Sequence, residues 1–180
     1  KSLHVFQRTP SSIDVRNNNE TDLAWAANLQ AGWQKQRMDN FNILVSGGDQ
    51  DVDLVNDGWT DIIRNLTGIA AKLASRKLGR RLTKIERAEL MELSDYKKMN
   101  FVRARAAEVV NDPNVAEKLK PWYRQFCKRP CFHDEYLDTY NRHNVTLVDT
   151  NGKGVDRLTE TGVMVGLEHY ELDCLIFATG

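Results

Sequence analysis

An apolar stretch at residues 3–8 predicts a β-strand that ends on a basic side chain, Arg8, just before Thr9 and Pro10. Proline cannot continue a β-ladder, so the strand must stop there. In doubly wound nucleotide-binding folds, an Arg at such a strand end accommodates a ribose 2′-phosphate, whereas an Asp or Glu reads the 2′-hydroxyl. Arg8 therefore indicates a site that selects NADPH. From these residues alone, the alternative is an ordinary strand followed by a solvated arginine.

The segment from about residue 20 to residue 120 has a helical period. Trp25, Leu29 and Trp33 recur at helical spacing, which favours a buried face over a platform for stacking. A second apolar stripe predicts one helix that starts near Asp57 and ends at Gly79. The stripe consists of Ile62, Leu66, Ile69 and Leu73.

Two capping signals mark helix ends in the second half of this segment. Thr83-x-x-Glu86 is a capping box, and it predicts a long charged helix that stops near Asn111. Asp112-Pro113 then predicts a short helix, with the Asp as its cap and the Pro in its first turn.

Strand signals return after Pro121 and are separated by the turn sequences Asn151-Gly152 and Thr161-Gly162. The predicted strands are residues 144–150, 155–159, 163–165 and 172–178. The fold class is therefore α/β, part of a Rossmann-like NADP-binding domain that an all-helical insert interrupts. Residues 1–18 form the first piece of that domain, residues 19–120 the insert, and residues 121–180 the second piece.

Charge and apolar patterning exclude two classes of partner. The 25 basic and 25 acidic residues balance, which argues against an electrostatic role toward nucleic acid or an anionic membrane. No run of 18 apolar residues is present, so nothing in the sequence predicts a membrane span. The basic cluster at residues 76–81 has acidic neighbours and no interleaved aromatic residues, which favours a solvated helix face.

The cysteines and acidic residues do not predict a metal site. Three cysteines are an odd number without a scaffold pattern, which favours reduced thiols in the cytoplasm. Cys127-x-x-x-Cys131-x-His133 lacks a second ligand pair at zinc-site spacing. The acidic segment 46–58 lacks the order of ligands of an EF-hand, so we expect a solvated connection there.

Four motifs occur in a fixed order along the chain. They are Phe6-Gln7-Arg8-Thr9-Pro10, Lys128-Arg129-Pro130 with Asp134-Glu135-Tyr136, Tyr140-Asn141-Arg142-His143-Asn144-Val145, and Glu171-Leu172-Asp173 with Ala178-Thr179-Gly180. With these motifs the chain resembles the flavin-dependent Baeyer–Villiger monooxygenases, in which one chain carries FAD and uses NADPH. The family's two G-x-G-x-x-G motifs lie upstream of the position of Lys1, so the resemblance predicts an interior fragment, inactive by itself, that ends at the junction with the FAD domain.

The resemblance implies roles for four basic or polar residues. Arg129 matches the family's essential arginine, which stabilises the negative charge that develops when reduced flavin meets oxygen. Lys128, Arg8 and Thr9 match the positions that hold the 2′-phosphate and ribose of NADPH. Without the flanking motifs, Lys128-Arg129 reads as a basic pair on the surface.

The implied reaction inserts one oxygen atom from O2 beside a ketone carbonyl to give an ester or lactone. Residues 11–16 and 32–34 look more like the family members that act on large cyclic ketones. The alternatives are a related flavin monooxygenase that oxidises nitrogen or sulfur, and a non-enzymatic helical binding module.

Overall fold

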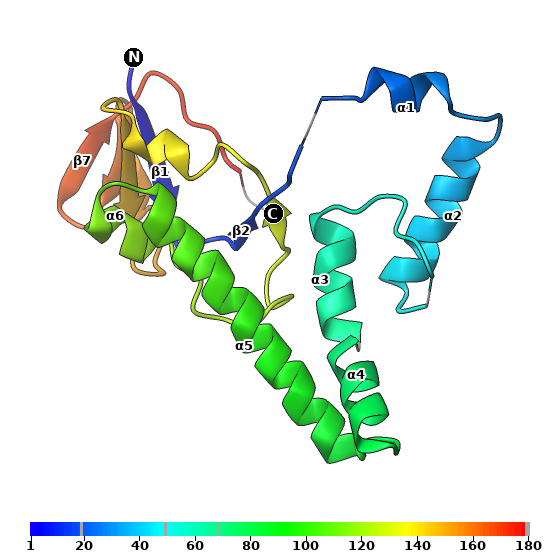
Figure 1. Cartoon of the computed structure of the whole chain (residues 1–180). Coiled ribbons are helices and arrows are strands. Elements are labelled where there is room, and N and C mark those ends of the chain that lie inside the picture. Colours follow the sequence, from blue (N-terminus) through cyan, green and yellow to red (C-terminus); the bar gives the residue numbers. More distant parts are fainter. Residues whose placement is uncertain (19, 49, 68, 179–180) are drawn as a thin grey trace.

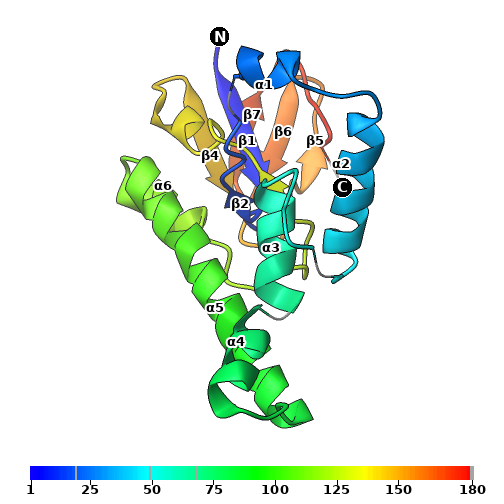
Figure 2. The ribbon, with the colours of Figure 1, turned by 45° about the vertical axis from the view of Figure 1, so that its right-hand side comes forward.

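The computed structural model describes residues 1–18, 20–48, 50–67 and 69–178. Strands gather at one end of the molecule, and a long helix, α5 (Lys84–Val109), runs away from them beside the helices α3 (Gly58–Thr67) and α4 (Ile69–Leu78) (Figure 1). Helix α2 (Trp33–Val45) lies on the side of α3 away from α5 (Figure 2), and the short helix α1 (Leu23–Ala27) precedes it. None of the described helices combines the length and the apolar character needed to cross a membrane.

A parallel strand pair forms the centre of the strand region. β1 (Leu3–Gln7) pairs with β4 (Val145–Asp149), in a register that places Leu3 opposite Val145 and Gln7 opposite Asp149. Both strands were predicted from their apolar patterns, and both are confirmed to within one residue at each end. Their parallel pairing joins segments that the whole helical region separates in sequence, as a crossover connection requires.

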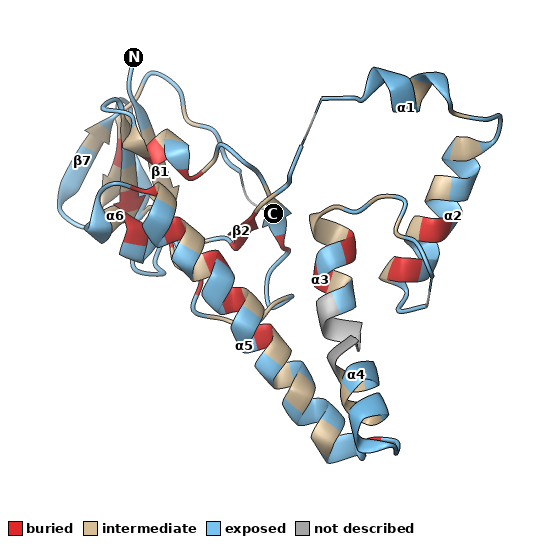
Figure 3. Ribbon diagram, viewed as in Figure 1, coloured by how far each residue is buried: buried red, intermediate tan, exposed pale blue. Residues whose placement is uncertain are grey.

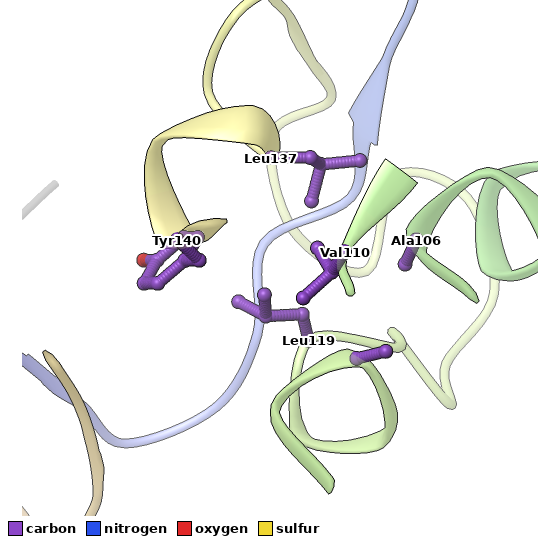
Figure 4. Packing of buried hydrophobic residues seen from close by; sticks show 6 residues of the cluster. Ala106, Val110, Leu119, Leu137 and Tyr140 are labelled. Carbon is purple, nitrogen blue, oxygen red and sulfur yellow. The ribbon is translucent and has the colours of Figure 1, made fainter. Parts of the chain in front are cut away.

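The main apolar cluster lies between these strands and the end of α5. It also includes α6 (Pro113–Lys118) and the 3-10 helix η1 (Asp138–Asn141) (Figure 4). Val5, Val145 and Leu147 pack against it from the two strands. The last turns of α5 therefore belong to the same core as β1 and β4. The buried members are Ala106, Val110, Ala116, Leu119, Leu137 and Tyr140.

A second parallel pair is short and was not predicted. β2 (Ile13–Asp14) pairs with β3 (Cys131–Phe132), with Ile13 opposite Cys131. Two flanking hydrogen bonds extend the pair, from the Cys131 amide to the Ser12 carbonyl at 3.0 Å and from the His133 amide to the Asp14 carbonyl at 3.0 Å. Each of these strands has two residues, which is too few to show the alternation of apolar and polar residues that predicts a strand.

The remaining strands form an antiparallel sheet of β5 (Arg157–Leu158), β6 (Gly162–Val165) and β7 (Glu168–Glu171). The prediction of strands at 155–159 and 163–165 is confirmed in position, although β5 is shorter, and β7 was missed. Gly162 is required here, because an added Cβ would lie 1.8 Å from the Tyr170 carbonyl oxygen. The Tyr170 ring meets Phe6 edge-on at 5.2 Å, which joins this sheet to β1.

The predicted strand at residues 172–178 is wrong for this structure. These residues adopt no strand, and the side chains of Ile176 and Phe177 are 81% and 70% exposed. A strand exists only when its amides and carbonyls pair with a neighbour, and no strand in the described parts of the chain pairs with this segment. Thr179 and Gly180, the end of the fourth motif, lie outside the described residues.

Both capping signals are confirmed. The Thr83 side chain accepts a hydrogen bond from the Glu86 amide, and the Glu86 carboxylate accepts one from the Thr83 amide, which opens α5 at Lys84. Asp112 accepts from the Asn114 amide at 2.8 Å and begins α6. These contacts are local, so the sequence alone predicts them well.

The apolar stripes predicted for the first helices are only partly buried (Figure 3). The helix expected from Asp57 to Gly79 is present on both sides of residue 68, as α3 and α4, and Gly79 follows α4 with φ +64°. Ile62 is 3% exposed, whereas Leu73 is 58% exposed. The side chains of the other two stripe residues, Leu66 and Ile69, lie outside the described part.

The predicted buried face of Trp25, Leu29 and Trp33 is also wrong. Gly32 adopts φ +90° between α1 and α2, so the three residues do not share one helix. Trp25 is 46% exposed and contacts Trp33 edge-on, with 5.9 Å between ring centroids. Helical spacing predicts a shared face only where the helix is continuous.

Candidate functional site

Arg8 and Thr9 directly follow β1, and hydrogen bonds of Gln7 hold the carboxyl end of this strand. Gln7 is buried, and its side-chain amide donates to the Lys118 carbonyl at 2.9 Å. The Gln7 carbonyl accepts hydrogen bonds from the Thr150 amide at 2.9 Å and from the Thr150 hydroxyl at 2.8 Å. Arg8 and Thr9 are themselves exposed. A rigid strand end thus presents two exposed polar side chains.

The Arg8 side chain lies against a glycine turn after β4. Gly154 adopts φ +87°, and its amide donates to the Thr150 hydroxyl at 2.8 Å. A Cβ at Gly154 would approach the Arg8 Cδ to 3.3 Å, so the turn leaves just enough room for the arginine stem. Within the described parts of the chain, the Arg8 guanidinium has no hydrogen-bond or carboxylate partner. Its charge is therefore available to an anion.

Tyr123 connects Lys128 to the segment that follows Arg8 and Thr9. Its hydroxyl donates a 2.8 Å hydrogen bond to the Pro10 carbonyl, and the Lys128 ammonium lies 5.4 Å from the centre of its ring. Burial raises the pKa of Tyr123 to about 12, so the phenol remains a donor at neutral pH. Lys128 is exposed and has no ion pair among the described residues.

Arg129 is placed by the residues that follow it. Pro130 is buried, and Cys131 begins β3, whose pairing with β2 fixes the exit of the loop. The Cys131 thiol approaches the Arg129 carbonyl at 3.8 Å. The Arg129 guanidinium is exposed and has no hydrogen-bond or carboxylate partner in the ranges that the structure describes.

The four predicted residues therefore occupy two chain segments that lie side by side. The Tyr123–Pro10 hydrogen bond joins the segments on one side, and the β2–β3 pair joins them on the other. No hydrogen bond joins the four side chains to one another in the described structure. Three cations without a carboxylate partner among the described residues, together with Thr9, are thus exposed on two joined segments. One of these segments leaves the carboxyl end of β1, which is where doubly wound folds bind nucleotides.

Asp134 holds the local backbone beside the candidate site. Its carboxylate accepts hydrogen bonds from the amides of Asn18, Asn17 and Arg16 at 3.0–3.1 Å. These amides hold the pKa of the carboxyl below its usual range. A carboxylate in this state accepts hydrogen bonds and is not suited to acid–base work at neutral pH.

Sequence reasoning did not identify Tyr123 as a residue of the site. It lies in an irregular segment, so no period connects it with Lys128, and its partner Pro10 is 113 positions away. A buried tyrosine usually finds a partner for its hydroxyl, but the sequence does not say which one.

A separate apolar groove lies on the helical region. It has a volume of about 480 Å³ and is lined by Trp33, Met38 and Phe41 of α2. Arg37 and Asp57 supply charge at its wall. None of the four predicted site residues lines it.

Curated relatives match the chain along its whole length. It is 56% identical over 178 residues to neopentalenolactone D synthase of Streptomyces avermitilis, covering 99% of this chain and 29% of the relative. It is 53% identical over 180 residues to a Baeyer–Villiger monooxygenase of Stachybotrys chlorohalonatus, covering all of this chain and 28% of the relative. The chain thus spans less than a third of the length of these two relatives. A scan against protein-family models finds no match.

Solved structures of monooxygenases share the fold. The polycyclic ketone monooxygenase of Thermothelomyces thermophila is 36% identical with a TM-score of 0.72, over 96% of this chain and 28% of that one. OTEMO in complex with FAD and NADP is 25% identical with a TM-score of 0.61, over all of this chain and 33% of that one. Sequence and structure agree over almost the whole chain, and the chain belongs to the Baeyer–Villiger monooxygenase family.

Proposed function

We propose that this chain is the part of an NADPH- and FAD-dependent monooxygenase that holds the 2′-phosphate of NADPH and supplies a fixed cation to the flavin. The proposal rests on three exposed cations, Arg8, Lys128 and Arg129, which have no carboxylate partner among the described residues and lie on two joined segments. The reaction converts a ketone to an ester or lactone with one oxygen atom from O2. The names of the relatives support this reaction, and the OTEMO complex supports both cofactors.

The residues present fit a phosphate group. Among the described residues, the Arg8 guanidinium and the Lys128 ammonium have no carboxylate partner, and Thr9, next to Arg8, is exposed. Charge-assisted hydrogen bonds from Arg and Lys are the strong contacts to phosphate oxygens. NADH lacks the 2′-phosphate, so these side chains would select between the two cofactors.

The role that we propose for Arg129 is electrostatic. Bound flavin supplies the redox chemistry that activates O2. Arg129 would hold a permanent positive charge where negative charge develops, because a guanidinium stays protonated at any working pH. A fixed donor of this kind stabilises charge without reorganisation.

We infer the domain arrangement from the same geometry. Residues 1–18 and 121–180 would form two pieces of a Rossmann-like NADP-binding domain, with residues 19–120 as a helical insert. The parallel β1–β4 pair and the helices that pack on it support this reading. The insert is not independent of the domain, because Ala106 of α5 and Val110, which directly follows α5, belong to the shared core.

We infer a large cyclic ketone as the substrate. Trp33 and Gln34, in the segment that suggested this preference, line the apolar groove on the helical region. The solved polycyclic ketone monooxygenase is a further support. A related enzyme that oxidises nitrogen or sulfur remains the second candidate, because the same cations would serve it equally well.

We also infer a reducing, cytoplasmic setting. The three cysteines, Cys127, Cys131 and Cys174, are free and exposed. Exposed free thiols are typical of proteins that work in a reducing compartment.

The test uses the full-length enzyme that contains this chain. The purified protein should be yellow, and a polycyclic ketone should accelerate its oxidation of NADPH and appear as a product heavier by one oxygen atom. A sulfide and a tertiary amine serve as parallel substrates. A colourless protein that does not oxidise NADPH would overturn the proposal. Sulfoxide or N-oxide formation without any ester would favour the second candidate.

A further inference from the structure

Helix α5 holds the segment that leads into Lys128 and Arg129. The Asp95 carboxylate accepts a 2.8 Å hydrogen bond from the Gln125 amide. Glu92, one turn earlier on α5, forms an ion pair with Arg124. Two neighbouring residues of the loop are thus attached to one face of one helix, shortly before the predicted site.

The same helix holds the segment that follows Arg129. The Arg105 guanidinium donates from Nη1 to the Ile13 carbonyl at 3.1 Å and from Nη2 to the His133 and Asp134 carbonyls at 3.1 Å each. It therefore holds β2 and the two residues that directly follow β3. A guanidinium donates in several fixed directions, which an ammonium on a flexible stem does not reproduce.

Asp95 is unusual on the face of α5 that it occupies. Met99, Val102 and Ala106 continue the same buried face, and each is 2–4% exposed, whereas Asp95 is a carboxylate at 6%. Its second oxygen and the polar atoms of the Gln125 side chain are buried and have no hydrogen-bond partner among the described residues. A buried polar group without its full set of partners destabilises a fold. Stability alone does not explain an Asp at this position.

We propose that Asp95 and Arg105 are positioning residues for Arg129, an assignment that rests on the proposed function. The Arg129 guanidinium has no partner in the described structure, so the backbone on each side of it decides where its charge lies. Asp95 holds the backbone before Arg129, at Gln125, and Arg105 holds the backbone after Arg129, at His133 and Asp134. Both act from one continuous helix of 26 residues, so the two ends keep a constant separation.

The experiment on the full-length enzyme measures two things separately. One is how well the backbone of residues 121–134 is held, and the other is how much ester the enzyme forms per NADPH. Arg105→Lys and Asp95→Leu are compared with the wild type, with Asp95→Asn as the conservative variant. Arg87→Lys is the matched control, because Arg87 is an exposed arginine on the same helix. Peptide-resolved hydrogen exchange over residues 121–134 is recorded without NADPH or ketone. Ester and hydrogen peroxide formed per NADPH are then measured, together with the rate of flavin reduction.

We expect faster exchange at residues 131–134 in Arg105→Lys and around Gln125 in Asp95→Leu. Ester per NADPH should fall by about tenfold to a hundredfold, because a displacement of about 1 Å costs that much in a positioned reaction. Hydrogen peroxide should rise, and flavin reduction should stay near the wild-type rate. Asp95→Asn retains an acceptor for the Gln125 amide and should recover most of the ester. Arg87→Lys should match the wild type in every measurement.

Three results would overturn the assignment. Exchange equal to the wild type in both variants would show that α5 does not hold the loop. Faster exchange with unchanged ester per NADPH would show that the loop does not position Arg129. Failure of Asp95→Asn to exceed Asp95→Leu would point to a merely structural role. If Arg105→Lys does not fold, the same measurements on Asp95→Leu test the assignment. A wild-type enzyme that makes no ester would instead overturn the proposed function, and this assignment with it.

Discussion

The Tyr123 hydroxyl donates a 2.8 Å hydrogen bond to the Pro10 carbonyl and so bridges 113 positions of sequence. Pro10 directly follows Arg8 and Thr9, and the Lys128 ammonium lies over the Tyr123 ring. One side chain therefore relates the two segments that we propose bind the same phosphate. The relative position of Arg8 and Lys128 depends on this contact.

Replacing Tyr123 by Phe should make the position of Lys128 relative to Arg8 less well fixed. The variant loses one hydrogen bond, which is worth about 1 kcal/mol in stability. NADPH should bind more weakly, because Lys128 and Arg8 are no longer held in register. Isothermal titration of the full-length enzyme with NADPH measures this loss. Tyr136→Phe is the control, since it removes a hydroxyl that bonds to Tyr140 and to no other described residue, and it should leave NADPH affinity unchanged.

Removing either proposed phosphate contact should change the preference between the two nicotinamide cofactors. Arg8→Ala or Lys128→Ala should each cost roughly 1.5–3 kcal/mol of NADPH binding. That loss corresponds to about one to two decades in the dissociation constant. NADH affinity should hardly change, and Arg157→Ala, on β5, serves as the control. Equal losses for NADPH and NADH would mean that these residues do not read the 2′-phosphate.

Arg129 should act on oxygenation and not on cofactor affinity. Loss of one preorganised donor to developing negative charge costs on the order of a hundredfold in turnover or more. Arg129→Ala should therefore stop ester formation while NADPH still reduces the flavin, and the oxygen consumed should leave as hydrogen peroxide. Arg129→Lys should restore little, because an ammonium lacks the planar set of donors. Stopped-flow flavin reduction and product yield measure both steps, and near-normal ester from Arg129→Ala would remove this residue from the site.

The start of α5 should be sensitive to acid. Arg80 and the Thr83 amide bind the Glu86 carboxylate and lower its pKa from 4.5 to about 2. A depressed pKa in the folded state stabilises the helix end above pH 4.5, and that contribution is lost as the pH falls through about 2. Hydrogen exchange in the first turn of α5, measured relative to the intrinsic rate at each pH, should lose protection over that range. Glu86→Gln retains a capping acceptor without the charge, so an equally steep dependence in this variant would contradict the assignment to Glu86.

The shared core should depend on Leu137. This residue is 2% exposed and lies between η1, α6 and the end of α5 (Figure 4). Leu137→Ala should lower the free energy of unfolding by about 2–5 kcal/mol, as large-to-small core changes do. Leu158→Ala, at 59% exposure, should change it by less than about 0.5 kcal/mol. Urea unfolding of the full-length protein compares them, and similar losses for both would contradict the packing described here.

Much of the candidate site was predicted from ordered motifs, whereas its geometry was not. The resemblance singles out Arg8, Thr9, Lys128 and Arg129, and their roles stay predictions. Nothing in the spacing of residues connects Tyr123 to Pro10, or Arg105 to Ile13 and His133. Those contacts join segments that are distant in sequence, so they follow from the tertiary structure alone.

The sequence by itself determined the elements whose signals are local. The Thr83–Glu86 capping box and the Asp112 cap form within one helical turn, so their residues are enough to begin α5 and α6. The apolar strands β1 and β4 were likewise visible in their own residues.

Only the tertiary structure decided which of these patterns is buried and paired. Residues 172–178 are as apolar as β1, yet they form no strand, because a strand needs a neighbour to take its hydrogen bonds. Trp25 and Trp33 have helical spacing, yet a left-handed glycine separates their helices and leaves Trp25 exposed. A side chain becomes core, and a strand becomes sheet, only when another part of the chain reaches it.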